Sequence, residues 1–295
     1  MKISSIDSIL KGAEKNHQAL WQYILQSEFQ DSGTPIEEIV ERVEKTYTVM
    51  RNAVRAGLRE NGRSLSGLTG GDAYKYYARI ETGRTLLSDF NAKAIAYAIA
   101  TNEYNASMGV IVAAPTAGAS GILPGVLIAA QEEFGYMDSD IVHSLIVASG
   151  IGAVIATRAT VSGAAGGCQA ECGSAAAMAA GALTYLLGGN NRQVMNAAAL
   201  ALKNSLGLAC DPVAGLVEVP CIKRNGVYAS MAITACDMAL SGIASFIPPD
   251  EVIDAMFQIG SMLPSCLRET AEGGLAVTPT GLAAREKVFG IKNDK

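Results

Sequence analysis

The stretch GGCQAECGSAAAMAAGA, residues 166–182, decides the fold that this sequence can adopt. It consists mainly of alanine and glycine, and it contains no proline and no β-branched residue. Alanine has the highest helix propensity, and small side chains on facing helices let their backbones approach closely. We therefore expect a buried helix over residues 167–187 at the centre of a bundle.

The sequence on either side of this stretch has a similar character. Segments rich in Ala, Gly, Ile, Val and Leu alternate with short Gly/Pro breaks, and no long stretch alternates with a period of two. This pattern predicts an all-α fold, a compact multi-helix bundle with Ala/Gly-rich central helices. The other helices expected in this part of the chain cover residues 89–103, 118–133, 138–157, 191–207, 226–245 and 249–260.

The first 60 residues are more charged and more amphipathic than the remainder. Apolar residues recur there at helical spacing, which predicts two surface helices, from Ile3 to Phe29 and from Pro35 to Glu60. The sequence contains no internal repeat and no Ser/Pro-rich linker. We therefore predict a single helical domain over residues 1–295, made of an amphipathic arm (1–60) and a body (61–295).

Composition excludes several classes of protein. Hydrophobic residues make up 49% of the 295 residues and charged residues 17%, with a net charge of −5 and no basic run. A nucleic-acid partner is therefore not expected. Residues 104–131, 141–157 and 172–191 are uncharged and long enough to span a membrane. Pro and Asn interrupt the first and Ala and Gly dominate the third, so a small multi-span membrane protein is the disfavoured alternative.

The N-terminal sequence lacks the apolar core and cleavage site of a secretory signal. Six cysteines in such a chain indicate reduced thiols or metal ligands rather than a disulfide framework. We therefore expect a cytoplasmic protein.

Three of the cysteines lie beside predicted helix ends. Cys168 follows two glycines and opens a helix, where free N–H groups and the helix dipole favour a thiolate or an anionic cluster. Cys210 is expected to end a helix before Asp211-Pro212, and Cys221 follows Pro220 in another break. Metal ligation and simple packing are both compatible with this spacing. Cys172, Cys236 and Cys266 lack the setting and are interpreted as small buried side chains.

Other chemical signals are weaker. The two histidines, His17 and His143, fit a solvated and a core position, which weakens any histidine-based nucleophile or zinc site. The glycine-rich breaks LTGGDA (68–73) and APTAGASGILPG (114–125) each lead into a predicted helix. N–H groups at such points suit a carboxylate or phosphate, although simple helix caps are equally compatible.

Four motifs together point to a family. SGLTGGDA, APTAGASGILPG, SGAAGGCQAECGSA and LKNSLGLACDPVAGLVEVPCIKRN resemble the α chain of the iron–sulfur-dependent bacterial L-serine dehydratases. The resemblance extends from about residue 40 to EGGLAVTPTG near residue 281. It implies a [4Fe–4S] cluster held by Cys168, Cys210 and Cys221 in a cluster-binding catalytic body.

The resemblance also implies a mechanism. The open fourth iron would act as a Lewis acid in the β-elimination of L-serine to pyruvate and ammonia, without pyridoxal phosphate. An open iron requires three thiolates, so Cys172 is not expected to be a ligand. The family's Ser/His-rich motif is absent from this chain, which implies that a β subunit completes the site and supplies the base.

Several other residues are candidates for contact with the small amino-acid substrate. Lys203, Asn204 and Arg224 are candidates for binding the substrate carboxylate or supporting the cluster. Predicted substrate-binding residues in the glycine-rich breaks are Thr69, Gly70, Gly71, Asp72, Pro115, Thr116, Ala117 and Gly118. Two alternatives stay open: the same chemistry on cysteine or threonine, and a structural zinc site formed by Cys168, Cys172, Cys210 and Cys221.

Overall fold

The computed structural model describes residues 3–59 and 62–290. Helices dominate this part of the chain, and no β-strand occurs in it apart from one isolated bridge between Cys210 and Arg268. The predicted all-α fold is therefore confirmed. The α-helices are α1 (Ile6–Lys15), α2 (Leu20–Ser32), α3 (Ile36–Gly57), α4 (Asp72–Glu81), α5 (Asp89–Ala106), α6 (Ile122–Phe134), α7 (Asp138–Arg158), α8 (Gly163–Gly166), α9 (Ser174–Leu186), α10 (Asn191–Lys203), α11 (Cys221–Leu240), α12 (Pro249–Met262) and α13 (Pro279–Phe289).

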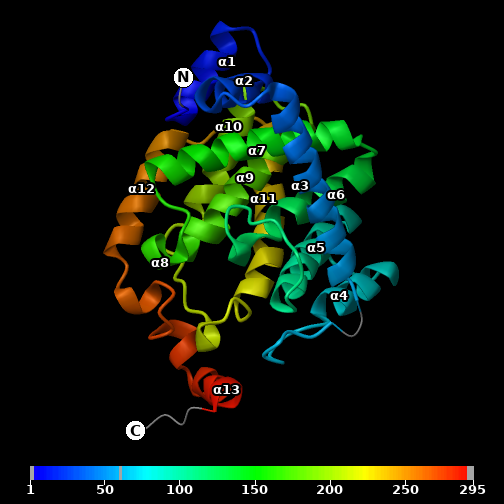
Figure 1. Ribbon diagram of the computed structural model, residues 1–295, viewed down its shortest axis with the longest axis vertical. Helices are drawn as coiled ribbons and strands as arrows, with labels where there is room; N and C mark the ends of the chain where they lie inside the picture. Colours follow the sequence, from blue (N-terminus) through cyan, green and yellow to red (C-terminus); the bar gives the residue numbers. More distant parts are fainter. Residues whose placement is uncertain (1–2, 60–61, 291–295) are drawn as a thin grey trace.

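Helix α9 forms the centre of the bundle (Figure 1). All of its residues except Tyr185 are buried, and it packs against α6, α7, α10 and α11. Small residues allow this close packing elsewhere in the core too. A Cβ atom on Gly125 of α6 would lie 2.8 Å from the carbonyl oxygen of Ala94 in α5. The Ala/Gly-rich composition therefore sets the short distances between the helices.

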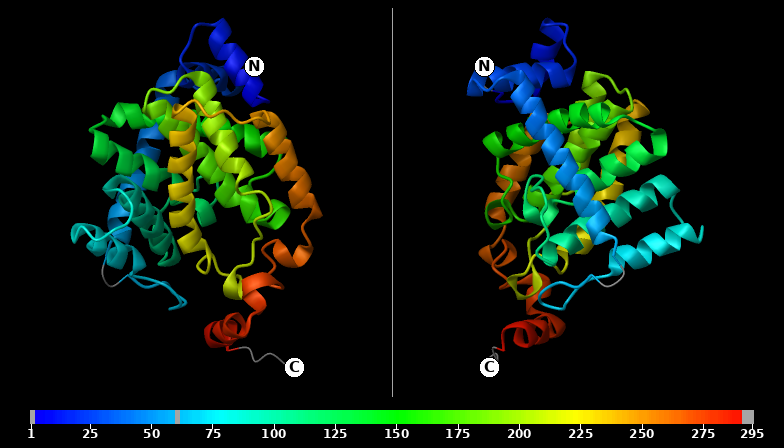
Figure 2. Two further views of the ribbon diagram at one scale, coloured as in Figure 1. Left: turned by 180° about the vertical axis from the view of Figure 1, so that it is seen from behind. Right: turned by 45° about the vertical axis from the view of Figure 1, so that its right-hand side comes forward.

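The N-terminal helices cover one end of the bundle, and α13 lies at the opposite end (Figure 1). The predicted helix over residues 3–29 is broken into α1 and α2 at His17, which has a φ of 52°. Helix α3 crosses the side of the bundle and packs on α5, α6 and α7 (Figure 2). The predicted boundary at residues 60–61 lies outside the described residues, so the division into arm and body stays a prediction.

Some predicted helix limits are wrong for identifiable reasons. Helix α10 ends at Lys203 rather than at residue 207, because the Asn204 side chain donates to the Leu200 carbonyl at 2.8 Å and the chain then turns at Gly207, whose φ is 87°. The segment predicted as a helix over residues 118–133 is a short 3₁₀ turn (η1, Ala117–Ala119) followed by α6. Helix α11 is shifted toward the N-terminus and begins at Cys221.

Helix α13 was not predicted, and for α4 only a helix start at LTGGDA was predicted, which agrees with its first residue, Asp72. Helix α4 has no local side-chain cap. Instead, the Glu103 carboxylate of α5 accepts from the backbone N–H groups of Asp72, at 2.9 Å, and Ala73, at 3.2 Å. A cap supplied from so far along the chain leaves no signature in the local sequence.

One helix in the described residues, α7, is long and apolar enough to cross a membrane. In the structure 67% of the most apolar stretch of this helix is buried inside the protein. Such burial is also typical of a core helix, as expected from its place beside α9.

Candidate active site

Cys168 is positioned by a break between two helical turns. Helix α8 ends at Gly166, and Gly167 adopts a φ of 76° before a π-helical turn (η2, Gln169–Gly173) leads into α9. The buried Gln169 side chain fixes this break by donating to Gly166 and Met256 and by accepting from the Gly207 N–H group. The expected helix start at Cys168 is therefore a π-turn, a form often found at functional sites.

The prediction that Cys210 ends a helix is wrong. Cys210 lies in an extended segment after α10 and pairs with the segment around Arg268. Its N–H group donates to Leu267 at 2.9 Å, and its carbonyl accepts from Glu269 at 2.7 Å. Backbone pairing therefore fixes the position of Cys210. Cys221, predicted to lie in a break after Pro220, is instead the first residue of α11.

The folded chain brings four thiols together. Cys168, Cys172, Cys210 and Cys221 are all buried and form no disulfide. The Sγ atoms of Cys168 and Cys172 lie 3.4 Å apart, and Cys168 also interacts with Cys210 and Cys221. Cys236 lies in the interior of α11 and Cys266 is half-buried. The π-turn, the extended segment and α11 thus each bring one predicted ligand into the same buried region, where Cys168 interacts with the other two.

Electrostatics within this group favour a single thiolate. Hydrogen bonds with Cys172 and Cys210, together with the positive charge of Arg224, hold the pKa of Cys168 well below its usual value. The pKa values of Cys172 and Cys210 are raised by their hydrogen bonds with Cys168, by burial and by the negative charge of Cys168. Burial and the Cys168 charge also raise the pKa of Cys221 to about 12. A cation between the thiols would favour several thiolates here, because a bound metal displaces the protons of its thiol ligands.

Among the three polar candidates, Arg224 is the one that interacts with the buried thiols. Its guanidinium donates to Ala209 and to the buried carboxylate of Asp211, each at 2.9 Å, and interacts with Cys168. Lys203 contacts Ser245 at 3.5 Å, and Asn204 bonds within its own helix. A role in substrate binding for Lys203 and Asn204 stays a prediction that these contacts do not support.

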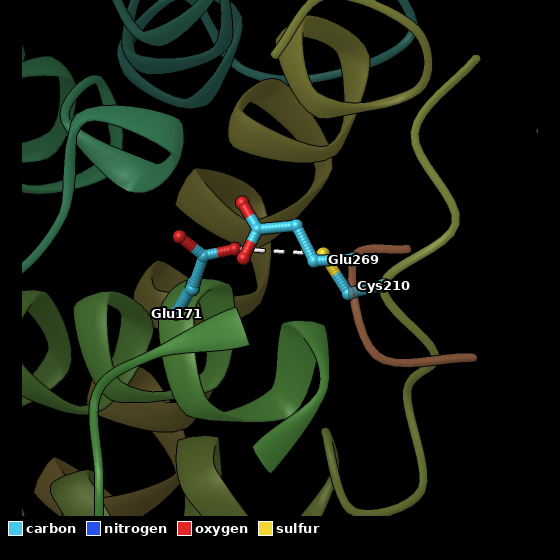
Figure 3. Close-up of side chains that lie close together, drawn as sticks. All are labelled: Glu171, Cys210 and Glu269. Carbon is cyan, nitrogen blue, oxygen red and sulfur yellow. Dashed lines mark hydrogen bonds between the residues drawn. The ribbon is translucent and has the colours of Figure 1, made fainter. Parts of the chain in front are cut away.

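Two carboxylates next to Cys210 were missed in the sequence (Figure 3). Oxygen atoms of Glu171 and Glu269 and the Cys210 sulfur all lie within 4.8 Å of one another. Burial raises the pKa of Glu171 to about 7, and the charges of Cys168 and Glu269 add to this shift. Mixed oxygen and sulfur donors of this kind can hold a divalent metal ion. The available sequence signal was the position of Glu171, three residues after Cys168 in GGCQAE.

The glycine-rich break at 114–125 reaches this site. Thr116 donates a hydrogen bond to Glu171 at 2.7 Å, and the Gly118 carbonyl accepts from Asn225 of α11 at 2.7 Å. Pro115 and Ala117 lie in the same loop, beside these two anchored residues. We call residues 115–118 the substrate loop, after their predicted role.

The second predicted loop, residues 69–72, is attached to the segment that carries Cys221. Thr69 donates to the buried Glu218 at 2.8 Å, and Asp72 forms an ion pair with Lys223 at 2.6 Å. Gly70 and Gly71 have φ values of 133° and 77°, which favour glycine. This loop therefore lies against the segment that leads into α11.

The two histidines lie apart from this group of residues. His17 is in the turn between α1 and α2. His143 of α7 stacks on Trp21 with ring centroids 3.8 Å apart. Neither is among the thiol, carboxylate and guanidinium groups described above, so the described site contains no histidine that could act as a base.

Fold and site together define a helical protein with a buried, thiol-rich centre suited to a metal. Comparison with known families gives a closer assignment: the family described as "Serine dehydratase alpha chain" matches residues 14–276. The chain belongs to this family, which confirms the resemblance seen in the sequence motifs.

Individual relatives agree with this assignment. The "Probable L-serine dehydratase, alpha chain" of Bacillus subtilis (strain 168) is 52% identical over 254 residues, which cover 86% of this chain and 84% of that protein. The "L-serine dehydratase, alpha chain" of Peptoniphilus asaccharolyticus is 43% identical over 266 residues, covering 90% and 91%. The "L-serine dehydratase" of Streptomyces coelicolor is 43% identical over 250 residues, covering 82% of this chain but only 54% of that protein.

Proposed function

We propose that this chain is the α subunit of an iron–sulfur L-serine ammonia-lyase, which converts L-serine into pyruvate and ammonia without pyridoxal phosphate. The observation that carries the proposal is the convergence of Cys168, Cys210 and Cys221 beside Arg224 in a member of the serine dehydratase alpha chain family. The names of the relatives support L-serine as the substrate.

The residues present fit a [4Fe–4S] cluster. Thiolates are the usual ligands of such clusters, and a cation would offset the Cys168 charge that opposes the ionisation of Cys210 and Cys221. Cys168, Cys210 and Cys221 would hold the cluster. When bound, it supplies a Lewis-acidic iron that polarises the C–O bond of the substrate.

The protein's own residues then have separate roles. The positive charge of Arg224 stabilises the Cys168 thiolate. Hydrogen bonds to Ala209 and Asp211 hold its guanidinium in place. The substrate loop lies beside the thiols and binds the amino acid. Removal of the α-proton and departure of the β-hydroxyl as water give aminoacrylate, which takes up water and yields pyruvate and ammonia.

The base that removes the α-proton comes from a β subunit. The words "alpha chain" in the relatives' names support a partner, and the matched part of the Streptomyces protein is only about half of that chain. A surface cavity of about 440 Å³, lined by Leu65, Met108 and Glu218 among others, lies next to the loop at 69–72. Leu65 and Met108 are strongly exposed, which supports this face as the one that meets the partner. The free thiols fit the reducing cytoplasm.

A second candidate is a closed zinc site. It is favoured by the 3.4 Å distance between Cys168 and Cys172, because a structural zinc site uses four thiolates. In that case Cys172 is an essential ligand and the centre has no open position for a substrate.

One preparation separates the two. The chain is purified anaerobically with its partner, and iron, acid-labile sulfide and zinc are measured together with pyruvate formation from L-serine, L-cysteine and L-threonine. About four irons per chain with matching sulfide support the cluster. Stoichiometric zinc without sulfide would overturn it.

The Cys172→Ala variant gives a second, independent test. We expect it to keep its iron and sulfide, because Cys172 is not a cluster ligand in this proposal. Loss of the metal from Cys172→Ala would favour the four-cysteine zinc site. Pyruvate formation by the α chain alone would contradict the role given to the partner.

A further inference from the structure

We propose that Glu171 is a positioning residue that fixes the substrate loop beside the cluster thiols. The inference rests on the proposed function for the substrate-binding role of the loop. The attachment of the loop to Glu171 rests on the contacts of the described residues. It assigns to the glutamate of GGCQAE a role in the placement of substrate rather than in holding the cluster.

The Glu171 carboxylate joins two segments that are distant in sequence. Its Oε1 atom accepts a hydrogen bond from Thr116 Oγ1 at 2.7 Å, and its Oε2 atom lies 3.7 Å from the Cys210 sulfur. The side chain is only 9% exposed. A buried carboxylate that accepts from the half-buried Thr116 hydroxyl sets the position of that hydroxyl, because burial of the carboxylate limits its exchange with water.

Two glycines leave the space that this carboxylate occupies. A Cβ atom on Gly118 of the substrate loop would lie 3.3 Å from Glu171 Oε1. A Cβ atom on Gly163 of α8 would lie 2.6 Å from Oε2 and 3.1 Å from the Cys210 sulfur. The carboxylate is therefore enclosed by the loop on one side and by α8 on the other, and this leaves it little freedom to move.

The far end of the loop has its own attachment. The fully buried Asn225 donates to the Gly118 carbonyl at 2.7 Å and accepts from the Gly121 N–H group at 2.9 Å. Asn225 belongs to α11, the helix that begins with Cys221. Asn225 thus holds the end of the loop, and Glu171, which lies against Cys210, holds Thr116.

The test compares four variants in the anaerobic complex with the partner subunit. They are Glu171→Gln, Glu171→Ala, Thr116→Val and the double variant Glu171→Ala/Thr116→Val. An amide at position 171 still accepts the Thr116 hydroxyl, whereas alanine cannot. The exposed Glu272→Ala, in the segment after Glu269, serves as the matched carboxylate control.

Steady-state kinetics and hydrogen exchange of residues 114–121 are measured on each variant. We expect Glu171→Ala to raise KM for L-serine about tenfold, with kcat changed less than about threefold. Thr116→Val has the same effect, and the double variant adds nothing to it, because both changes remove one hydrogen bond. Glu171→Gln and Glu272→Ala stay within about threefold of the wild type. Exchange in the loop increases in Glu171→Ala and stays unchanged in Glu171→Gln.

Three results would overturn the inference: unchanged loop exchange in Glu171→Ala, additive effects of the two single changes, or loss of iron from Glu171→Ala. The last would mean that Glu171 serves the cluster itself. Absence of lyase activity in the wild-type complex would instead refute the proposed function. The hydrogen-exchange comparison would still decide whether Glu171 holds the loop, so the two failures are distinguishable.

Discussion

The start of α11 and its interior place two buried cysteines in opposite surroundings. Cys221 and Arg224, at the start, face the thiols of the π-turn and the extended segment. Cys236, further along, lies in the alanine-rich core, where burial raises its pKa to about 11 although Thr184 offers a hydrogen bond. Burial alone therefore keeps a thiol neutral and inert. The low pKa of Cys168 comes from hydrogen bonds with Cys172 of the same π-turn and with Cys210, and from the guanidinium of Arg224 in α11.

The largest expected effect separates these two regions directly. Cys210→Ala is expected to lose the iron–sulfur cluster and all serine turnover, because two thiolates cannot replace three. Cys236→Ala is its matched control and should keep full iron while losing about 1 kcal/mol of stability from the small cavity. Iron and sulfide per chain, measured on anaerobic preparations, check both. Equal iron in the two variants would contradict the assignment of Cys210.

Arg224→Met is expected to have the next largest effect. It removes the charge beside Cys168 and leaves the buried Asp211 carboxylate without its partner, which costs about 3 kcal/mol. Arg158→Met breaks a much more exposed pair with Asp254 and should cost less than about 1 kcal/mol. Chemical denaturation of both variants measures the difference. A similar loss in the two would show that the Arg224 pair contributes no more than a surface ion pair.

A pair of glycine substitutions probes the space around each region. Gly163→Ala places a Cβ atom against Glu171 and Cys210, both held by other contacts, so we expect a higher KM for L-serine. Gly152→Ala in α7 meets the end of the flexible Met178 side chain at 2.9 Å. Its helix-propensity gain of about 1 kcal/mol should largely offset that contact. Kinetics and denaturation distinguish the two, and equal KM values would contradict the tight fit around Glu171.

The smallest effect concerns pH. The pKa of Cys236 is raised above the ordinary thiol value of 9.0 to about 11, so the folded protein holds this proton more tightly than the unfolded chain does. Its contribution to stability is fully present below pH 9 and is lost as the pH rises toward 11. Cys236→Ala should reduce the slope of stability against pH in this window by up to about 1.4 kcal/mol per pH unit. Denaturation at pH 8, 9, 10 and 11 measures the slopes, and parallel curves would contradict the assignment.

Much of the fold was predictable because composition controls it. The alanine-rich run that became α9 has high helix propensity and small side chains throughout, so a buried central helix was the expected result. The glycines of LTGGDA indicated the start of helix α4, but its cap could not be predicted because Glu103 belongs to another helix. The break at His17 also escaped prediction, since a left-handed residue other than glycine gives little sequence signal.

The site was predictable only in part, for similar reasons. Cys168 and Cys221 lie next to Gly and Pro residues that mark breaks in any fold. Cys210 was assigned to a helix end because the segment with which it pairs, near Arg268, is remote in sequence. Glu171 and Glu269 come together only in the folded chain, from the π-turn and from a segment almost a hundred residues later.

The pairing of Cys210 with the segment at 267–269 also has a consequence for the order in which the protein is assembled. The Asp211 carboxylate accepts from the Leu275 N–H group at 2.9 Å, so residues 265–277 hold both Cys210 and its neighbour in place. During synthesis these residues leave the ribosome after Cys168, Cys210 and Cys221. We therefore expect the cysteines to reach their final arrangement only after residues 265–277 have been synthesised, which places metal loading after that stage of translation.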